Sequence, residues 1–185
     1  MRRIQNLMEQ WLFIGPDNRQ EQVNLPHTWN AKDGQDGGND YYRGTCHYEK
    51  TFEKPEFDPE TEEVYLEFLG VNASSDVTVN GKELAHHDGG YSTFRINITE
   101  VLEDQNKLEV TVDNSVNGKV YPQKADFTFY GGIYRDVRFL IVSKEHFDLD
   151  YLGSNGIKIT PEVKENEANV HICLLYTSDA ADEAR

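Results

Sequence analysis

Short stretches of alternating apolar and polar residues recur along this chain, and they constrain its fold more than any other feature. Residues 64–68 (VYLEF) and 108–112 (LEVTV) show the period of two that lets a strand bury one face and expose the other. Helical periodicity is almost absent, and many short, evenly spaced strands are typical of a sandwich or a barrel. The strands predicted for the main part of the chain are residues 46–52, 64–69, 76–79, 82–86, 93–98, 107–112 and 133–142. The sequence therefore predicts an all-β fold.

Turn signals separate these strands. Asn80 and Gly81 lie between two predicted strands, and this pair tolerates the positive φ angles of a type I′ turn, so we expect a tight hairpin. The adjacent Gly89 and Gly90 predict a further turn because glycine adopts backbone conformations that other residues avoid. Residues 30–39 (NAKDGQDGGN) are interpreted as a long loop.

The charge of the chain limits its partners. Against 33 acidic residues there are 18 basic ones, which gives a formal net charge of -15. Nucleic acid and anionic membrane surfaces would be repelled by the molecule as a whole. We therefore expect no nucleic-acid partner and no membrane partner, and a ligand that is neutral or indifferent to charge.

Cysteine usage and the N-terminal sequence bear on the compartment. Cys46 and Cys173 are far apart and fit neither a disulfide framework nor a zinc motif. The first residues carry two arginines but no apolar run like that of a signal peptide. No stretch approaches the roughly 20 apolar residues that a membrane-spanning helix requires. These features predict a cytoplasmic protein.

The chain divides into one complete domain and part of another. Residues 1–143 hold the regular strand pattern, and residues 144–172 are interpreted as the truncated start of a second β-domain. The strands expected there are residues 147–151, 156–163 and 169–172. Two or three strands cannot close a sandwich, so this part should expose an apolar face and an unpaired edge unless it leans on the first domain.

Residues 173–185 (CLLYTSDAADEAR) break the alternation abruptly. They resemble the in-frame translation of a transposase-type sequencing adapter, and we interpret them as an artefact of sequence assembly and set them apart. The natural protein is then expected to continue beyond Ile172.

Four segments together resemble the N-terminal domain of family 2 glycoside hydrolases, a family that holds β-galactosidases, β-glucuronidases and β-mannosidases. The segments are residues 24–30 (NLPHTWN), 42–52 (YRGTCHYEKTF), 66–81 (LEFLGVNASSDVTVNG) and 126–137 (DFTFYGGIYRDV). Each alone is a weak signal, but their order and spacing together are specific. The resemblance extends over residues 11–172.

The resemblance implies a jelly-roll sandwich of the galactose-binding type, then an immunoglobulin-like domain, then a (β/α)₈ barrel with two catalytic glutamates. A retaining glycosidase needs two carboxyl groups about 5 Å apart. Since the barrel lies outside this chain, we expect no catalytic residue and no hydrolysis here. The intact enzyme would hydrolyse terminal β-D-galactosides, could form a homo-oligomer, and would use Mg²⁺ and Na⁺, whereas this fragment needs no cofactor.

By resemblance, two side chains reach from this domain to the sugar. Asn72 would bind a hydroxyl near the glycosidic centre, and Asp126 would bind a galactosyl hydroxyl, with a sodium ion as a further ligand. An amide can both donate to and accept from hydroxyls, and a carboxylate accepts strongly. Alternatively, Asn72 ends a strand and caps a turn, and Asp126 forms a salt bridge with Arg135 or Lys124.

Other polar and aromatic residues are better explained by structure than by binding. Trp29 is expected to fill the core beneath a loop rather than to stack on a sugar, and His27 is likewise not expected to bind one. His86, His87 and Asp88 have the side chains of metal ligands, but adjacent residues of a strand point to opposite faces. Among the tyrosines, an exposed position is expected for Tyr91, and positions in the wall or core for Tyr41, Tyr42, Tyr130 and Tyr134.

Other functions fit the same fold. A stand-alone carbohydrate-binding module is one alternative, and a packing domain that only stabilises the barrel is another. The chain continues past Val142 into further strands, which favours the truncated enzyme over the module. A β-glucuronidase or β-mannosidase is the alternative for the substrate, although residues 70–73 (GVNA) and 147–151 (FDLDY) look more like those of β-galactosidases.

Overall fold

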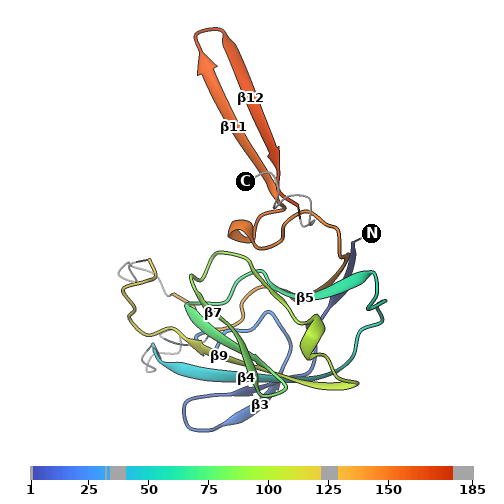
Figure 1. The fold of residues 1–185 in the computed structure, drawn as a ribbon. Coiled ribbons are helices and arrows are strands. Elements are labelled where there is room, and N and C mark those ends of the chain that lie inside the picture. Colours follow the sequence, from blue (N-terminus) through green and yellow to red (C-terminus); the bar gives the residue numbers. More distant parts are fainter. Residues whose placement is uncertain (1, 32, 34–40, 122–128, 177–185) are drawn as a thin grey trace.

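The computed structural model describes residues 2–31, 33, 41–121 and 129–176. Two antiparallel sheets face each other and form a β-sandwich (Figure 1). The strands are β1 (Arg3–Asn6), β2 (Trp11–Ile14), β3 (Gln20–Val23), β4 (Thr45–Glu53), β5 (Glu62–Phe68), β6 (Ser74–Val79), β7 (Lys82–Asp88), β8 (Phe94–Asn97), β9 (Gln105–Asp113), β10 (Val137–Ser143), β11 (Ile157–Lys164) and β12 (Glu167–Leu174). The 3-10 helices are η1 (Thr99–Val101) and η2 (Tyr151–Gly153), and none of the described helices is long and apolar enough to cross a membrane.

One sheet has four strands in the order β1-β10-β5-β8, and the other has six in the order β3-β2-β4-β9-β6-β7. Large side chains from both sheets fill the space between them, among them Trp11, Tyr48, Phe68 and Phe139, each at most 1% exposed. Burial of each such side chain contributes about 1.5–3 kcal/mol. The predicted all-β sandwich is confirmed.

Strand β10 begins later than the sequence pattern predicts. The expected strand was residues 133–142, but the observed strand starts at Val137. Before it, the carbonyl of Ile133 accepts a hydrogen bond from the His27 amide (2.8 Å), and Gly132 pairs with Asn72. Because of these contacts, the backbone before Val137 does not join the hydrogen-bond ladder of the four-stranded sheet.

The outer face of the four-stranded sheet is partly covered by the chain that follows β10. Leu149, in that following segment, forms a small apolar cluster with three side chains of β5 and β10, namely Tyr65, Leu140 and Val142. As a result β5 is buried on both faces, and its last five residues are all buried.

Strands β11 and β12 form a separate hairpin that projects from the sandwich (Figure 1). The paired residues on one face are apolar, as in Ile157–Leu174 and Ile159–Ile172, and every residue of both strands is exposed. The predicted exposed apolar face is therefore present, and the hairpin itself does not lean on the first domain. The domain division at residue 143 stays a prediction.

The strand predicted at residues 147–151 is wrong. Phe147 forms only an isolated bridge with Tyr176, and Tyr151 begins η2. The Asp148 carboxylate accepts hydrogen bonds from the amides of Asp150 (2.7 Å) and Tyr151 (3.2 Å), so it turns the chain locally. Residues 173–176 belong to the segment interpreted as an assembly artefact. Cys173 and Leu174 end β12, and Tyr176 forms the bridge with Phe147. The origin of this segment stays a prediction.

The β6–β7 hairpin gives a direct test of the turn. Asn80 (φ 52°) and Gly81 (φ 77°) have the positive φ angles of a type I′ turn, as predicted. A Cβ at Gly81 would meet nothing within 4 Å, so Gly81→Ala adds backbone strain alone. We expect it to lower the free energy of unfolding by about 1 kcal/mol or more in urea denaturation.

Gly118→Ala is the matched control. Gly118 also has open space around it but does not adopt the left-handed conformation. Its replacement should change stability by less than about 0.5 kcal/mol. Equal losses in the two variants would contradict the conformational explanation.

Candidate functional site

Asn72 lies just after β5, where several parts of the chain converge. Its backbone exchanges two hydrogen bonds with Gly132, from Asn72 N to Gly132 O (3.0 Å) and from Gly132 N to Asn72 O (3.1 Å). Its side chain is engaged at both ends, because Tyr121 donates its hydroxyl to Oδ1 (2.6 Å) and Nδ2 donates to the carbonyl of Tyr130 (2.7 Å). Asn72 is only 3% exposed. Asn72 therefore links Tyr121 to Tyr130, which lie on either side of residues 122–128 in the sequence.

These two hydrogen bonds use one donor and one acceptor site of the Asn72 side-chain amide. Oδ1 has a second lone pair and Nδ2 a second hydrogen, so one acceptor and one donor site are not used by Tyr121 and Tyr130. Gly90 lies against this side chain, since a Cβ there would be 2.4 Å from Asn72 Oδ1. A larger residue at position 90 would displace the amide.

Three tyrosines lie near Asn72, because Tyr121 and the Tyr130 carbonyl bond to its side chain and Tyr91 stacks on Tyr121, and we call Tyr91, Tyr121 and Tyr130 the tyrosine shelf. The rings of Tyr91 and Tyr121 are stacked, with centroids 4.7 Å apart, and Tyr121 also contacts Phe129 at 5.6 Å. Tyr91 is 57% exposed, as predicted, and Tyr130 is 40% exposed, so Tyr130 is not part of the core. Burial raises the pKa of Tyr121, so its hydroxyl stays a neutral donor to Asn72.

Asp126, the other residue predicted to bind sugar, lies outside the described residues, as does Lys124. Arg135, the other predicted partner of Asp126, lies with its guanidinium 5.4 Å from the centroid of the Tyr134 ring. The roles of Asp126 and of its sodium ligand stay predictions.

Trp29 and His27 have structural positions. Trp29 packs on the core and stacks with Phe13 at 6.1 Å between centroids. His27 Nδ1 is 2.8 Å from the buried Tyr48 hydroxyl, and burial lowers the pKa of His27. The predicted packing of Trp29 on the core is confirmed. Gly131 permits the packing, because a Cβ there would be 2.2 Å from the Trp29 ring.

His86 and His87 point to opposite faces of β7, as expected. His86 contacts two carboxylates, with Nδ1 2.6 Å from Asp76 and Nε2 3.1 Å from Asp88. His87 instead stacks on Phe94, with centroids 4.2 Å apart. Across the described part of the chain, no group of three or more His, Cys, Asp or Glu side chains is arranged to hold a metal ion.

Sequence reasoning missed Tyr121. Its hydroxyl contacts Asn72 across 49 positions of sequence, and nothing in the neighbouring residues marks that contact. A pairing between distant residues could have been detected only from the fold.

Comparison with known proteins identifies the family. A family described as glycosyl hydrolase 2 galactose-binding domain-like matches residues 37–149. The chain belongs to glycosyl hydrolase family 2. The match spans the strands of the sandwich from β4 to β10 and includes Asn72 and the tyrosine shelf.

Relatives within family 2 are similar over most of this chain. A β-glucuronidase of Bacteroides fragilis is 39% identical over 86% of the chain and 23% of its own length. A β-galactosidase of Thermoanaerobacter pseudethanolicus is 30% identical over 78% of the chain and 22% of its own length. The crystal structure of an FMN-binding β-glucuronidase from Faecalibacterium prausnitzii L2-6 is 42% identical with a TM-score of 0.85, covering 96% of this chain and 28% of that one. The chain thus spans about a quarter of the length of these curated relatives.

Removal of the Tyr121 hydroxyl tests the packing around Asn72. Tyr121→Phe leaves the buried Asn72 Oδ1 without this donor, so we expect a loss of about 1–3 kcal/mol in the free energy of unfolding. Tyr151→Phe is the control, since that ring is exposed and lies in η2, and it should change stability by less than about 0.5 kcal/mol. Similar small changes in both variants would show that the hydrogen bond contributes nothing.

The contacts of His86 predict a pH effect. The hydrogen bond with Asp76, and then that with Asp88, raises the pKa of His86. The pair therefore stabilises the fold at pH values below the unfolded pKa of about 6.5, and this contribution is lost as pH rises through the folded pKa. Asp76→Asn should lower the pKa of His86 in an NMR titration and leave that of His27 unchanged. A pKa of His86 that does not move would refute the assignment.

Proposed function

We propose that this chain is the front domain of a longer family 2 glycosidase. In this proposal Asn72 and the tyrosine shelf form one wall of a sugar pocket that domains outside this chain complete. The observation that carries the proposal is the match to glycosidases over most of this chain and only a quarter of theirs. Asp126 contributes a further sugar contact.

The proposed substrate is a β-glucuronide. The relatives at 39% and 42% identity are named as β-glucuronidases, and they are more similar to this chain than the β-galactosidase at 30%. A β-galactoside, preferred from the sequence alone, is the second candidate, and the relative from Thermoanaerobacter supports it.

The chemistry of the wall suits either sugar. The aromatic faces of the shelf can pack against the C–H face of a pyranose, and their hydroxyls can exchange hydrogen bonds with its rim. The remaining donor and acceptor of Asn72 can do the same. Cleavage would require the two carboxyl groups of a retaining glycosidase, which we place in the barrel of the longer protein; the cofactors proposed for the intact enzyme are Mg²⁺ and Na⁺.

Activity on two matched substrates tests the proposal. The complete enzyme should release p-nitrophenol from p-nitrophenyl β-D-glucuronide with a kcat/KM at least about 10-fold above that for the β-D-galactoside. The chain of 185 residues alone should release none. The reverse preference would establish the galactoside, and turnover by the chain alone would refute the assignment of catalysis to other domains.

Substitution of Asp126 tests the sugar-facing edge. Asp126→Ala in the complete enzyme should lower kcat/KM by about 10-fold or more, equivalent to about 1.4 kcal/mol. Asp104→Ala is the control, because Asp104 lies just before β9, at the end of that strand far from the site. The other end of β9, at Asp113, is near the site, since the Asp113 carbonyl accepts a hydrogen bond from the amide of Ala73, the residue after Asn72. Equal activity in the two variants would assign the domain a packing role only.

A stand-alone carbohydrate-binding module is distinguished by affinity. In that case the chain alone would bind p-nitrophenyl β-D-glucuronide as tightly as any longer protein that contains it. Under the present proposal, the chain alone binds at least about 100-fold more weakly, since it supplies only one wall of the pocket.

A further inference from the structure

The outer face of β5 carries a charged residue that is fully buried. Glu67 is 0% exposed although it points away from the sandwich core. Its two oxygens bind different arginines, with Oε1 2.7 Å from Arg95 Nε and Oε2 in contact with Arg138 Nε, and the partly exposed Arg2 also places its Nη2 3.5 Å from Oε1. A buried carboxylate requires such partners because its desolvation is costly.

Arg95 does more than neutralise Glu67. Its Nη1 donates to the carbonyl of Leu149 (2.8 Å) and to the carbonyl of Ser154 (2.6 Å), which lie on either side of η2. The Arg95 side chain is 4% exposed. Because Glu67 fixes the direction of the guanidinium, Nη1 is held where both carbonyls of the following segment can reach it. Arg138 binds the same carboxylate through its Nε. Unlike Arg95, it makes no side-chain hydrogen bond to the segment after β10 among the contacts described.

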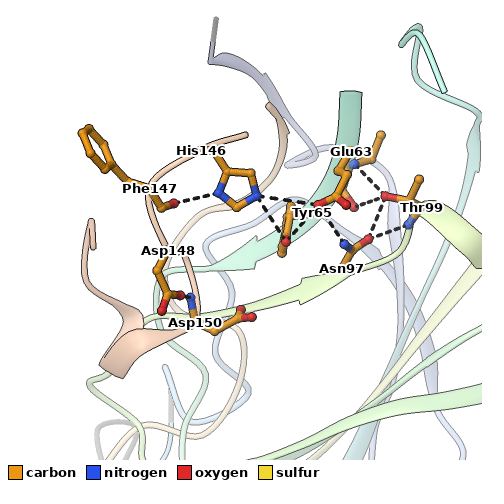
Figure 2. Close-up of polar contacts among 9 residues, drawn as sticks. Glu63, Tyr65, Asn97, Thr99, His146, Phe147, Asp148 and Asp150 are labelled. Carbon is orange, nitrogen blue, oxygen red and sulfur yellow. Dashed lines mark hydrogen bonds and ion pairs between the residues drawn. The ribbon is translucent and has the colours of Figure 1, made fainter. Parts of the chain in front are cut away.

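A second group of contacts holds the start of the same segment. The ring of His146 lies edge-on to Tyr65, with centroids 5.6 Å apart, and its Nε2 is 3.6 Å from Glu63 Oε2 (Figure 2). Glu63 also accepts from the hydroxyl of Tyr65 (3.2 Å) and from Asn97 Nδ2 (3.2 Å). His146 is thus held by residues of β5, while Asn97 links Glu63 to β8.

The turn at η2 fits closely on the sandwich. Gly153 has a φ of 64°, and a Cβ there would be 2.1 Å from the carbonyl oxygen of Thr93, just before β8. Together with Leu149 in its apolar cluster, these contacts attach the segment at several points along its length.

We propose that Arg95 is a positioning residue that fixes residues 144–156 on the first domain and so sets the direction of the β11–β12 hairpin. The segment forms a rigid joint, and Arg95 is its central polar contact. The inference concerns contacts within this chain and is independent of the proposed substrate and activity.

Paired arginine variants test the joint in the chain of 185 residues. Arg95→Gln and Arg138→Gln each take one arginine from Glu67, but only the first removes the bonds to Leu149 and Ser154. We expect hydrogen exchange at the Ser154 amide, which bonds to Tyr151 O, to accelerate at least 10-fold in Arg95→Gln and less than 2-fold in Arg138→Gln. Exchange at Val110 in β9 serves as the internal reference and should not change.

Residual dipolar couplings measure the consequence for the hairpin. In the unmodified chain and in Arg138→Gln, hairpin and sandwich should share one alignment tensor, whereas Arg95→Gln should require two. Equal protection of Ser154 in Arg95→Gln and the unmodified chain would overturn the proposal, as would equal loosening in both variants. If Arg95→Gln fails to fold, Arg95→Lys is the deciding variant, because lysine can pair with Glu67 but cannot also bridge the carbonyls of Leu149 and Ser154. Unchanged protection of the Ser154 amide in Arg95→Lys would refute the proposal.

Discussion

The burial of β5 on both faces is the constraint on which the rest of the structure depends. Leu66 and Phe68 fill the space between the sheets, while Tyr65 and Glu67 lie under the segment that follows β10. An apolar pair of similar shape could replace a buried ion pair at little cost, whereas removal of one partner is strongly destabilising. The outward charge of Glu67 therefore commits the chain to covering this face with Arg95 and the residues that Arg95 binds.

The same strand leads into the candidate site. Asn72 follows β5 closely, and its hydrogen bonds with Tyr121, Tyr130 and Gly132 join it to residues at least 49 positions further along the chain. The glycines at positions 90 and 131 allow side chains to approach the backbone at distances that a Cβ would prevent. The position of Asn72 is thus fixed by packing from the domain core outward.

Sequence reasoning succeeded where the information is local. Alternation identified the central strands, and Asn80 with Gly81 identified the turn, because each depends on neighbouring residues. It failed at β1 and β3, whose residues are almost all exposed, and at β2 (WLFI), whose four residues are all apolar, so none of the three shows a clear alternation. Residues 147–151 alternate like a strand, but the Asp148 carboxylate bonds to the next amides and forms a turn. The contacts of Tyr121 and Arg95 depend on the assembled fold.

The bare apolar side of the β11–β12 hairpin has a practical consequence for the isolated polypeptide. Within the described part of the chain no other strand pairs with its two long edges, and its isoleucines and valines are exposed, so both can meet a similar surface. The net charge of -15 holds molecules apart in dilute buffer. Added salt screens that repulsion and leaves the attraction between apolar surfaces intact, so solubility falls as ionic strength rises.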